Sequence, residues 1–499
     1  MVSIKKSVFQ GIYHTDYNWI IFKKVLIQIE KCCIIKFKAV SDLPSDGNMA
    51  VKEKIMNERE IALYILMDVF KDGGYNNIAL RKALNAHPEM TNVQKAFVTE
   101  IVNGTLRNLI RIVYIVNQFS KTPVKKMKPF IRTNIRMGIY QLIFMDKIPQ
   151  SAVCNEAVKL AKKHKFASLS GFVNGILRNV ARNIDNISYP NKDKEPVKHL
   201  SVVYSCPEWI IEYWLKSYDF ETVNKICIAN NKAPSISLCV NTLKNTKEEL
   251  ADTLKNEGVE IDMDTLLPNS LYVRKTSNIG ELESYKKGLF HIMDESSMLA
   301  TRILNPSENS VVIDVCSAPG GKSFATAEIM KNTGKVISRD IYEHKAELIK
   351  EGADRLGLTN VEVQVKDASE DNEDIKADFV LVDAPCSGLG LVRKKPDIKN
   401  NKTMADVEEL ASLQRKILAV ASKKVKKDGI LVYSTCTVSE KENVENVRWF
   451  VDNFDFEPVD FSELLPEKVK YETAKKGYIE ILPSDYGTDG FFISKFRRK

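Results

Sequence analysis

Cysteine is scarce in this sequence, and long hydrophobic runs are missing. The nine cysteines are odd in number, scattered over 499 residues and free of C-x-x-C pairs. This pattern excludes the disulfide framework of a small secreted domain and the paired-cysteine type of zinc site, so we expect no metal. Scattered thiols are typical of the reducing cytoplasm. No stretch approaches the roughly 18 uncharged apolar residues of a membrane span, so we expect no membrane association.

Acidic residues are nearly absent from one long segment. Between residues 105 and 182 there are fifteen lysines and arginines but only two acidic residues, Asp146 and Glu156. The whole chain has a formal charge of just +8. A solvated helix face explains a short basic run, but it does not explain a one-sided excess across a whole segment. The segment therefore predicts a polyanionic partner.

The first 58 residues differ from the rest of the chain. Their apolar stretch, residues 19–29, is short, is broken by Lys23 and Lys24, and has no small-residue cleavage site after it. These features argue against a signal peptide. We assign residues 1–58 to an N-terminal extension, and we expect residues 1–48 to lie ahead of a downstream start such as Met49 or Met56.

Two structural parts precede residue 301. Residues 59–182 carry apolar side chains at three-to-four spacing, with breaks near Gly73, Pro88, Pro123 and Pro149, which predicts a domain of five or more helices. Residues 183–300 begin with an Asn-, Lys- and Asp-rich stretch and then mix helical and strand-like runs. We interpret them as a linker and a small α/β connecting module.

Residues 301–499 alternate between apolar runs and amphipathic segments. The runs are short and suited to buried parallel strands; they are Ser310–Cys316, Lys335–Arg339, Val361–Val365, Phe379–Val382 and Ile430–Ser434. This alternation predicts a Rossmann-like, doubly wound α/β domain with helices on both faces of the sheet.

The first of these runs ends in a glycine turn, Asp314-Val-Cys-Ser-Ala-Pro-Gly-Gly-Lys-Ser323. A phosphate-binding P-loop would need glycine where Cys316 stands, and the dinucleotide pattern G-x-G-x-x-G is absent. Asp340 and Asp367 follow the next two strands, where carboxylates can accept hydrogen bonds from the ribose hydroxyls and the adenine edge of an adenosine. The pattern predicts an S-adenosylmethionine site. A glycine turn without a ligand is the alternative for the loop alone.

Two cysteines follow the fourth and fifth strands, in Asp383-Ala-Pro-Cys-Ser-Gly388 and Tyr433-Ser-Thr-Cys-Thr437. Parallel strands deliver both tips to one crevice. The C5 carbon of cytosine is a poor nucleophile, but a thiolate that adds to C6 turns the ring into an enamine whose C5 can attack a methyl donor. Most free cysteines are merely small buried residues. Two at neighbouring strand tips, one of them after Asp-Ala-Pro, favour the catalytic interpretation.

These motifs carry a family resemblance. DVCSAPGGKS, DAPCSG and YSTCT resemble the signatures of the Nop/Sun family of RNA 5-methylcytosine methyltransferases. The segments Phe97–Arg107, Gly138–Leu142 and Gly171–Arg178 resemble its NusB-like RNA-binding domain. The resemblance runs from about residue 59 to the closing Gly490-Phe-Phe-Ile493. It implies an all-α NusB-like domain followed by a class I methyltransferase domain that modifies C5 of a cytosine in 16S ribosomal RNA, either naked or partly assembled.

The resemblance also assigns roles to residues. Cys436 would be the nucleophile, Cys386 would assist product release, and Asp383 would bind the target base. The basic run Arg393-Lys-Lys395 would face the RNA backbone. The cofactor site would be lined by the following residues: Cys316, Ser317, Ala318, Pro319, Gly320, Gly321, Lys322, Asp340, Asp367 and Asp383.

Two positions depart from the family pattern. Cys239 stands in Leu-Cys-Val-Asn where an arginine is usual, and Met293 stands where a glutamine is usual. Neither lies in the cofactor or nucleophile motifs. Two rival functions remain: a catalytically idle RNA-binding or antitermination protein, and a methyltransferase that acts on transfer RNA. The intact cysteine and glycine motifs argue against the first rival, and the helical domain argues against the second.

Overall fold

The computed structural model describes residues 56–72, 76–275 and 278–499. The chain divides into two units, Met1–Met56 and Asn57–Lys499, and all the helices and strands named below belong to the second unit. The expected extension lies almost entirely outside the described residues, as do Cys32 and Cys33. Within the described ranges, no helix is long and apolar enough to cross a membrane.

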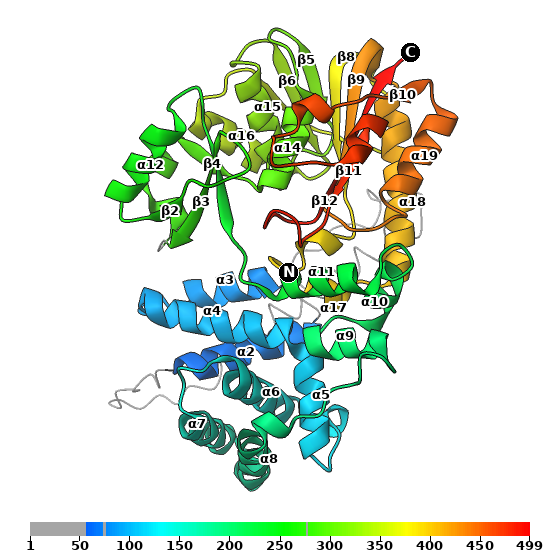
Figure 1. The fold of residues 1–499 in the computed structure, drawn as a ribbon. Coiled ribbons are helices and arrows are strands. Elements are labelled where there is room, and N and C mark those ends of the chain that lie inside the picture. Colours follow the sequence, from blue (N-terminus) through cyan, green and yellow to red (C-terminus); the bar gives the residue numbers. More distant parts are fainter. Residues whose placement is uncertain (1–55, 73–75, 276–277) are drawn as a thin grey trace, which may run out of the picture. The chain divides into compact units, whose positions relative to one another are not determined.

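A bundle of α-helices forms the first domain (Figure 1). Its members are α2 (Glu58–Asp72), α3 (Asn76–Asn85), α4 (Asn92–Arg107), α5 (Leu109–Phe119), α6 (Pro129–Phe144), α7 (Gln150–Lys163) and α8 (Ser170–Arg182). Helix α6 is its centre, since it is buried along most of its length. Glycines allow the close helix contacts: a Cβ at Gly104 would overlap the ring of Tyr140, and one at Gly138 would press on Leu177. The predicted helical domain is confirmed, and its breaks fall where glycine and proline indicated.

Helices α9 (Pro196–Tyr204), α10 (Glu208–Trp214) and α11 (Phe220–Asn231) lead into the connecting module. Its antiparallel sheet has the order β2-β3-β1-β4, with β1 (Ile236–Val240), β2 (Glu260–Asp262), β3 (Ser270–Lys275) and β4 (Phe290–Ile292). Helices α12 (Lys247–Asn256) and α13 (Glu283–Lys286) accompany the sheet, and α12 packs its leucines on it over an apolar core.

The third domain is built on an eight-stranded mixed sheet (Figure 1). Five strands are parallel: β5 (Val311–Asp314), β6 (Lys335–Asp340), β7 (Val361–Val365), β8 (Ala377–Asp383) and β9 (Val425–Thr435). They match the predicted runs. Three further strands, β10 (Phe456–Pro458), β11 (Tyr478–Ile481) and β12 (Phe491–Arg498), extend the sheet antiparallel beyond β9. The sequence interpretation did not include these three strands.

Each face of this sheet has its own apolar core. Helices α14 (Glu295–Leu304), α15 (Gly321–Ile329) and α16 (Glu343–Leu356) cover one face. Helices α18 (Met404–Ser422) and α19 (Val444–Asn453) cover the other, and the single turn α17 (Ile398–Asn401) precedes α18. This is the predicted doubly wound arrangement, and it leaves the carboxyl ends of the strands free to carry a site.

Candidate active site

The carboxyl ends of the parallel strands meet around one cavity of about 830 Å³. Strands β5, β6 and β8 end in aspartates, and the cysteine motifs follow β8 and β9. The cavity is lined by seven of the residues predicted from sequence: Cys316, Ala318, Asp340, Asp367, Asp383, Cys386 and Cys436. The topology therefore brings together side chains that are up to 120 positions apart in the sequence.

The other predicted residues of the glycine turn shape the loop and do not line the cavity. Ser317 donates its backbone N–H to the carbonyl of Arg339 (2.7 Å), which ties the loop to β6. Gly320 has a φ of +109°, and a Cβ there would strike the ring of Phe324 at 2.3 Å, so this turn requires glycine. Asp314 accepts a hydrogen bond from Ser323 (2.7 Å), and burial raises its pKa to about 7.

Two aspartates stand at the neighbouring strand ends. Asp340 accepts the backbone N–H of Tyr342 at Oδ1 (3.1 Å), and Asp367 accepts the N–H and hydroxyl of Ser369 (2.8 and 2.7 Å). These local bonds fix both carboxyl groups at the wall of the cavity. Ile341 and Tyr342, which directly follow Asp340, also line the cavity and are half exposed. The sequence interpretation missed them, although the signal was available: they directly follow a strand-terminal acid.

The two catalytic cysteine candidates are in direct contact. Cys386 Sγ lies 3.2 Å from Cys436 Sγ. The pKa of Cys386 is raised well above its ordinary value, first by its hydrogen bond with Cys436 and then by burial. Cys386 therefore stays a thiol that can donate its S–H to the sulfur of Cys436. Such a donor stabilises the negative charge of a thiolate on Cys436.

Asp383 is held beside this pair from two sides. Its Oδ2 accepts a hydrogen bond from Lys322 Nζ (2.8 Å), and its Oδ1 accepts one from the hydroxyl of Ser434 (2.9 Å). Burial alone would lower the pKa of Lys322, but Asp383 outweighs it, and the pKa is raised. Lys322 is therefore a fixed positive charge beneath the cavity, which explains its place in the motif although it does not line the cavity.

A buried glutamate joins the two cysteine loops from below. Glu442 accepts the backbone N–H of Ser387 (2.8 Å), the hydroxyl of Ser387 (2.5 Å) and the side-chain amide of Gln414 (3.0 Å). Ser387 also bonds the hydroxyl of Thr437 (2.7 Å), so the residues that follow Cys386 and Cys436 are linked. Sequence reasoning missed Glu442, because it stands in a polar run that looks like a solvated helix start.

The basic run after the first cysteine motif differs from its prediction. Arg393 is buried and donates to the carbonyl of Gly487 (2.8 Å) and to Asp489 (3.3 Å). Lys394 pairs with Asp294 and Asp489 (2.6 and 2.7 Å). The prediction that this run faces RNA is therefore wrong for Arg393, whose charge is used inside the protein. Lys394 and Lys395 do line the cavity.

Most basic residues of the helical domain are exposed, unlike Arg393. Of the fifteen, eleven are exposed: Lys121, Lys125, Lys126, Lys128, Lys147, Lys159, Lys162, Lys163, Lys165, Arg178 and Arg182. Only a minority have acidic partners, such as Lys159 with Glu156 and Lys163 with Glu60. The excess positive charge therefore lies on the surface of this domain.

The residues at the strand ends fit an adenosine-containing methyl donor. Carboxyl groups follow successive strands beside a turn that tolerates no side chain at Gly320, and the cavity is large enough for such a ligand. Asp340 and Asp367 would hold the nucleoside, and the loop from Cys316 to Lys322 would cradle the rest. Together, the fold and this site define a Rossmann-like S-adenosylmethionine-dependent methyltransferase.

Comparison with known proteins identifies the family. The model of the 16S rRNA methyltransferase RsmB/F matches residues 301–497, that of the NusB family residues 56–182, and that of the RsmF/B ferredoxin-like domain residues 206–280. A probable ribosomal RNA small subunit methyltransferase B of Bacillus subtilis is 40% identical, covering 88% of this chain and 98% of the relative. The protein of the same name from Synechocystis is 31% identical, and the match covers 89% of this chain and 100% of that protein. The chain belongs to the ribosomal RNA small subunit methyltransferase B family, and its cofactor is S-adenosylmethionine.

Solved structures agree with this assignment. The crystal structure of PH0851 is 26% identical, with a TM-score of 0.72, and the match covers 88% of this chain and 97% of that one. NSun6 from Pyrococcus horikoshii, solved with SFG, is 25% identical with a TM-score of 0.53 over 58% of this chain and 98% of that one.

Proposed function

We propose that this protein is a 16S rRNA (cytosine-C5)-methyltransferase that works in the cytoplasm on naked or partly assembled RNA and forms a covalent bond from Cys436 to C6 of the target base. The observation that carries the proposal is the pair of sulfurs 3.2 Å apart, beside Asp383, at the wall of the cofactor cavity. A methyltransferase that acts on nitrogen or oxygen has no need of a second thiol in contact with a first.

The chemistry starts at Cys436. Its thiolate adds to C6 of the cytosine, and the S–C6 bond forms as the ring electrons move toward N3 and C5. Asp383 would accept a hydrogen bond from the amino group of the base, and from N3 once N3 has taken up a proton, which stabilises the changed ring. Lys322 and Ser434 fix the orientation of that carboxyl group, so little reorganisation is needed when the base arrives.

S-adenosylmethionine supplies the methyl group as a sulfonium electrophile when it is bound. Asp340 and Asp367 would hold its nucleoside, Asp383 would lie near the reacting end, and the glycine turn would approach it by backbone alone. These are proposed roles of the residues that surround the cavity.

Release reverses the covalent step. After C5 carries the methyl group, a base removes the proton from C5, the electrons reform the C5–C6 double bond, and the sulfur of Cys436 leaves C6. Cys386 assists this elimination from its position against Cys436. The net change replaces the C5 hydrogen with a methyl group and returns both cysteines to their starting state.

The helical domain supplies affinity for the RNA. Its surface carries the eleven exposed basic side chains, which suit contacts to phosphates. An idle RNA-binding protein would need only this half. It would not need a close pair of thiols together with a cofactor cavity.

Bisulfite sequencing of ribosomal RNA from cells with and without the gene tests the proposal. One cytosine of 16S rRNA should resist conversion in the parent and become convertible in the deletion strain. Unchanged 16S rRNA, together with a lost methyl group in transfer RNA, would replace the proposed substrate by the rival one.

A further inference from the structure

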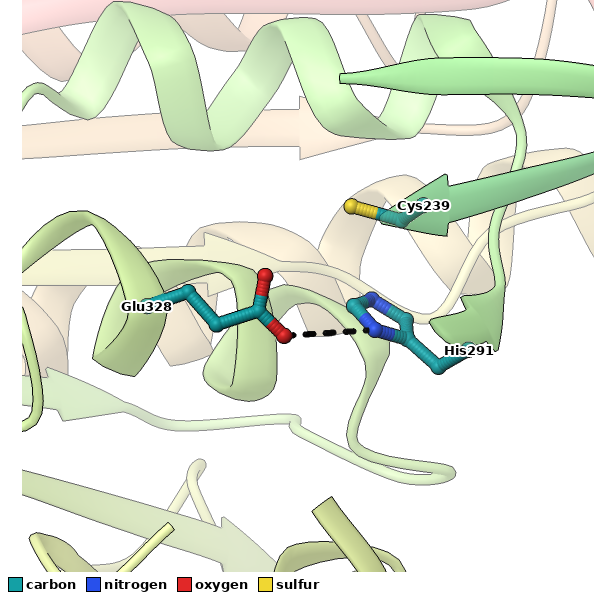
Figure 2. Close-up of side chains that lie close together, drawn as sticks. All are labelled: Cys239, His291 and Glu328. Carbon is teal, nitrogen blue, oxygen red and sulfur yellow. Dashed lines mark ion pairs between the residues drawn. The ribbon is translucent and has the colours of Figure 1, made fainter. Parts of the chain in front are cut away.

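Three side chains with metal-binding chemistry meet away from the catalytic cavity. Cys239 comes from β1, His291 from β4 and Glu328 from α15, and one ligand atom of each lies within 4.8 Å of the other two. All three side chains are buried. Figure 2 shows the sulfur, the imidazole ring and the carboxylate directed toward one shared space.

The polar atoms of this group are poorly satisfied by the protein. Neither ring nitrogen of His291 has a hydrogen-bond partner among the described residues, and the same is true of Glu328 Oε1. The approach of His291 Nδ1 to that oxygen is 3.6 Å, which is longer than a hydrogen bond. A buried polar group without a partner is unfavourable, so this group calls for a ligand that can bind one ring nitrogen of His291 and Glu328 Oε1 at the same time.

We propose that Cys239, His291 and Glu328 bind a zinc ion that links the connecting sheet to helix α15 behind the cofactor loop. Thiolate sulfur, neutral imidazole nitrogen and carboxylate oxygen are all established zinc ligands, and water completes the coordination. A dication with one thiolate and one carboxylate is neutral overall, which suits a buried site. Zinc–ligand bonds of about 2.0–2.3 Å place ligand atoms roughly 3.3–3.8 Å apart. The 3.6 Å between His291 Nδ1 and Glu328 Oε1 already lies in this range.

The test uses the full-length protein and metal ions alone. Zinc is measured by mass spectrometry after purification, and metal-free protein is then titrated with Co²⁺, which reports a thiolate ligand by its charge-transfer absorption. We expect one zinc per chain and a cobalt–thiolate band in the wild type. Cys239→Ser should lose both, and added zinc should raise the melting temperature of the wild type but not of this variant.

The paired catalytic thiols are a competing metal site, so the matched control is the double variant Cys386→Ala with Cys436→Ala. It should keep the zinc and the cobalt band. Glu328→Gln preserves volume and remains informative if Cys239→Ser does not fold: it should weaken cobalt binding at least about tenfold while keeping the band at saturation.

Two outcomes overturn the proposal. Wild-type protein that binds neither zinc nor cobalt would mean that Cys239, His291 and Glu328 are a buried polar cluster without a metal. A band retained in Cys239→Ser and lost in the double variant would place the metal on the catalytic thiols.

Discussion

The contact between the sulfurs of Cys386 and Cys436 gives the two residues different chemical roles. One thiol must remain protonated to stabilise a charge on the other, and the raised pKa of Cys386 marks it as the donor. We therefore expect Cys436→Ser to abolish methylation and form no adduct, because a serine hydroxyl is far less ionised than a thiol. Cys386→Ser should attack and methylate but release slowly, leaving protein bound to RNA.

Denaturing gel electrophoresis separates these outcomes. The trapped species of Cys386→Ser should migrate slowly and disappear after ribonuclease treatment, and the double variant should show none, since attack precedes trapping. If Cys436→Ser is trapped and Cys386→Ser is inert, the roles are reversed. If both single variants methylate without trapping, the covalent mechanism is wrong.

Asp340 is the acid best placed to report on the cofactor alone. It lies at the cavity wall, and one of its oxygens accepts the Tyr342 backbone N–H. Asp340→Ala should weaken S-adenosylmethionine binding by roughly 1.5–3 kcal/mol, because a charged acceptor for ribose hydroxyls is lost. Calorimetry measures this, and RNA affinity should stay within experimental error. Unaltered cofactor binding by a folded variant would contradict the assignment.

At the scale of elements, the cysteine loops depend on Glu442. Glu442→Ala leaves the N–H and hydroxyl of Ser387 and the amide of Gln414 without their acceptor. We expect a loss of at least about 2 kcal/mol in the free energy of unfolding, measured by urea denaturation. Turnover should fall as well, since both loops that carry sulfur lose their common anchor.

Glu442→Gln is the matched control. Its amide oxygen can accept the Ser387 N–H, and its amide nitrogen can donate to the Ser387 hydroxyl, so most of the stability should return. A Glu442→Ala protein with wild-type stability and turnover would show that the loops hold themselves in place.

The elements also show where sequence reasoning works and where it fails. The parallel strands were predictable because they are apolar runs, three of which end in Asp314, Asp340 and Asp383. Strands β10 and β11 are three and four residues long, too short for a periodic pattern. In β12, charged residues such as Lys495 interrupt the apolar run.

Side-chain groups assembled from distant segments were equally hidden. Cys239, His291 and Glu328 lie on three elements and share no spacing, so a search for paired cysteines predicted no metal. Arg393 looked like an RNA contact because its neighbours are basic, and only the fold reveals Asp489 opposite it. In both cases the decisive partner is far away in the sequence.

At the scale of the whole molecule, the distribution of charge assigns RNA affinity to the helical domain and catalysis to the methyltransferase domain. The basic excess lies on the helical domain, whereas aspartates and lysines line the catalytic cavity in nearly equal numbers. RNA affinity should therefore fall steeply with salt, and that dependence should come from the helical domain. Lys125, Lys126, Lys162 and Lys165 are exposed there. Replacing all four with glutamine should reduce the slope of log affinity against log salt by up to about 0.7 for each lost phosphate contact.

The control replaces four exposed lysines of the catalytic domain away from the strand ends that carry the site: Lys416, Lys423, Lys427 and Lys499. Both variants lose the same formal charge, so a general effect of net charge would flatten both slopes equally. If the lysines of the helical domain contact phosphates, only the slope of the first variant should become flatter. Binding of 16S rRNA fragments is measured by filter retention at several salt concentrations, with S-adenosylmethionine affinity as the check on folding. Equal slopes in the two variants would remove the RNA-binding role from the helical surface, because only the position of the charge differs between them.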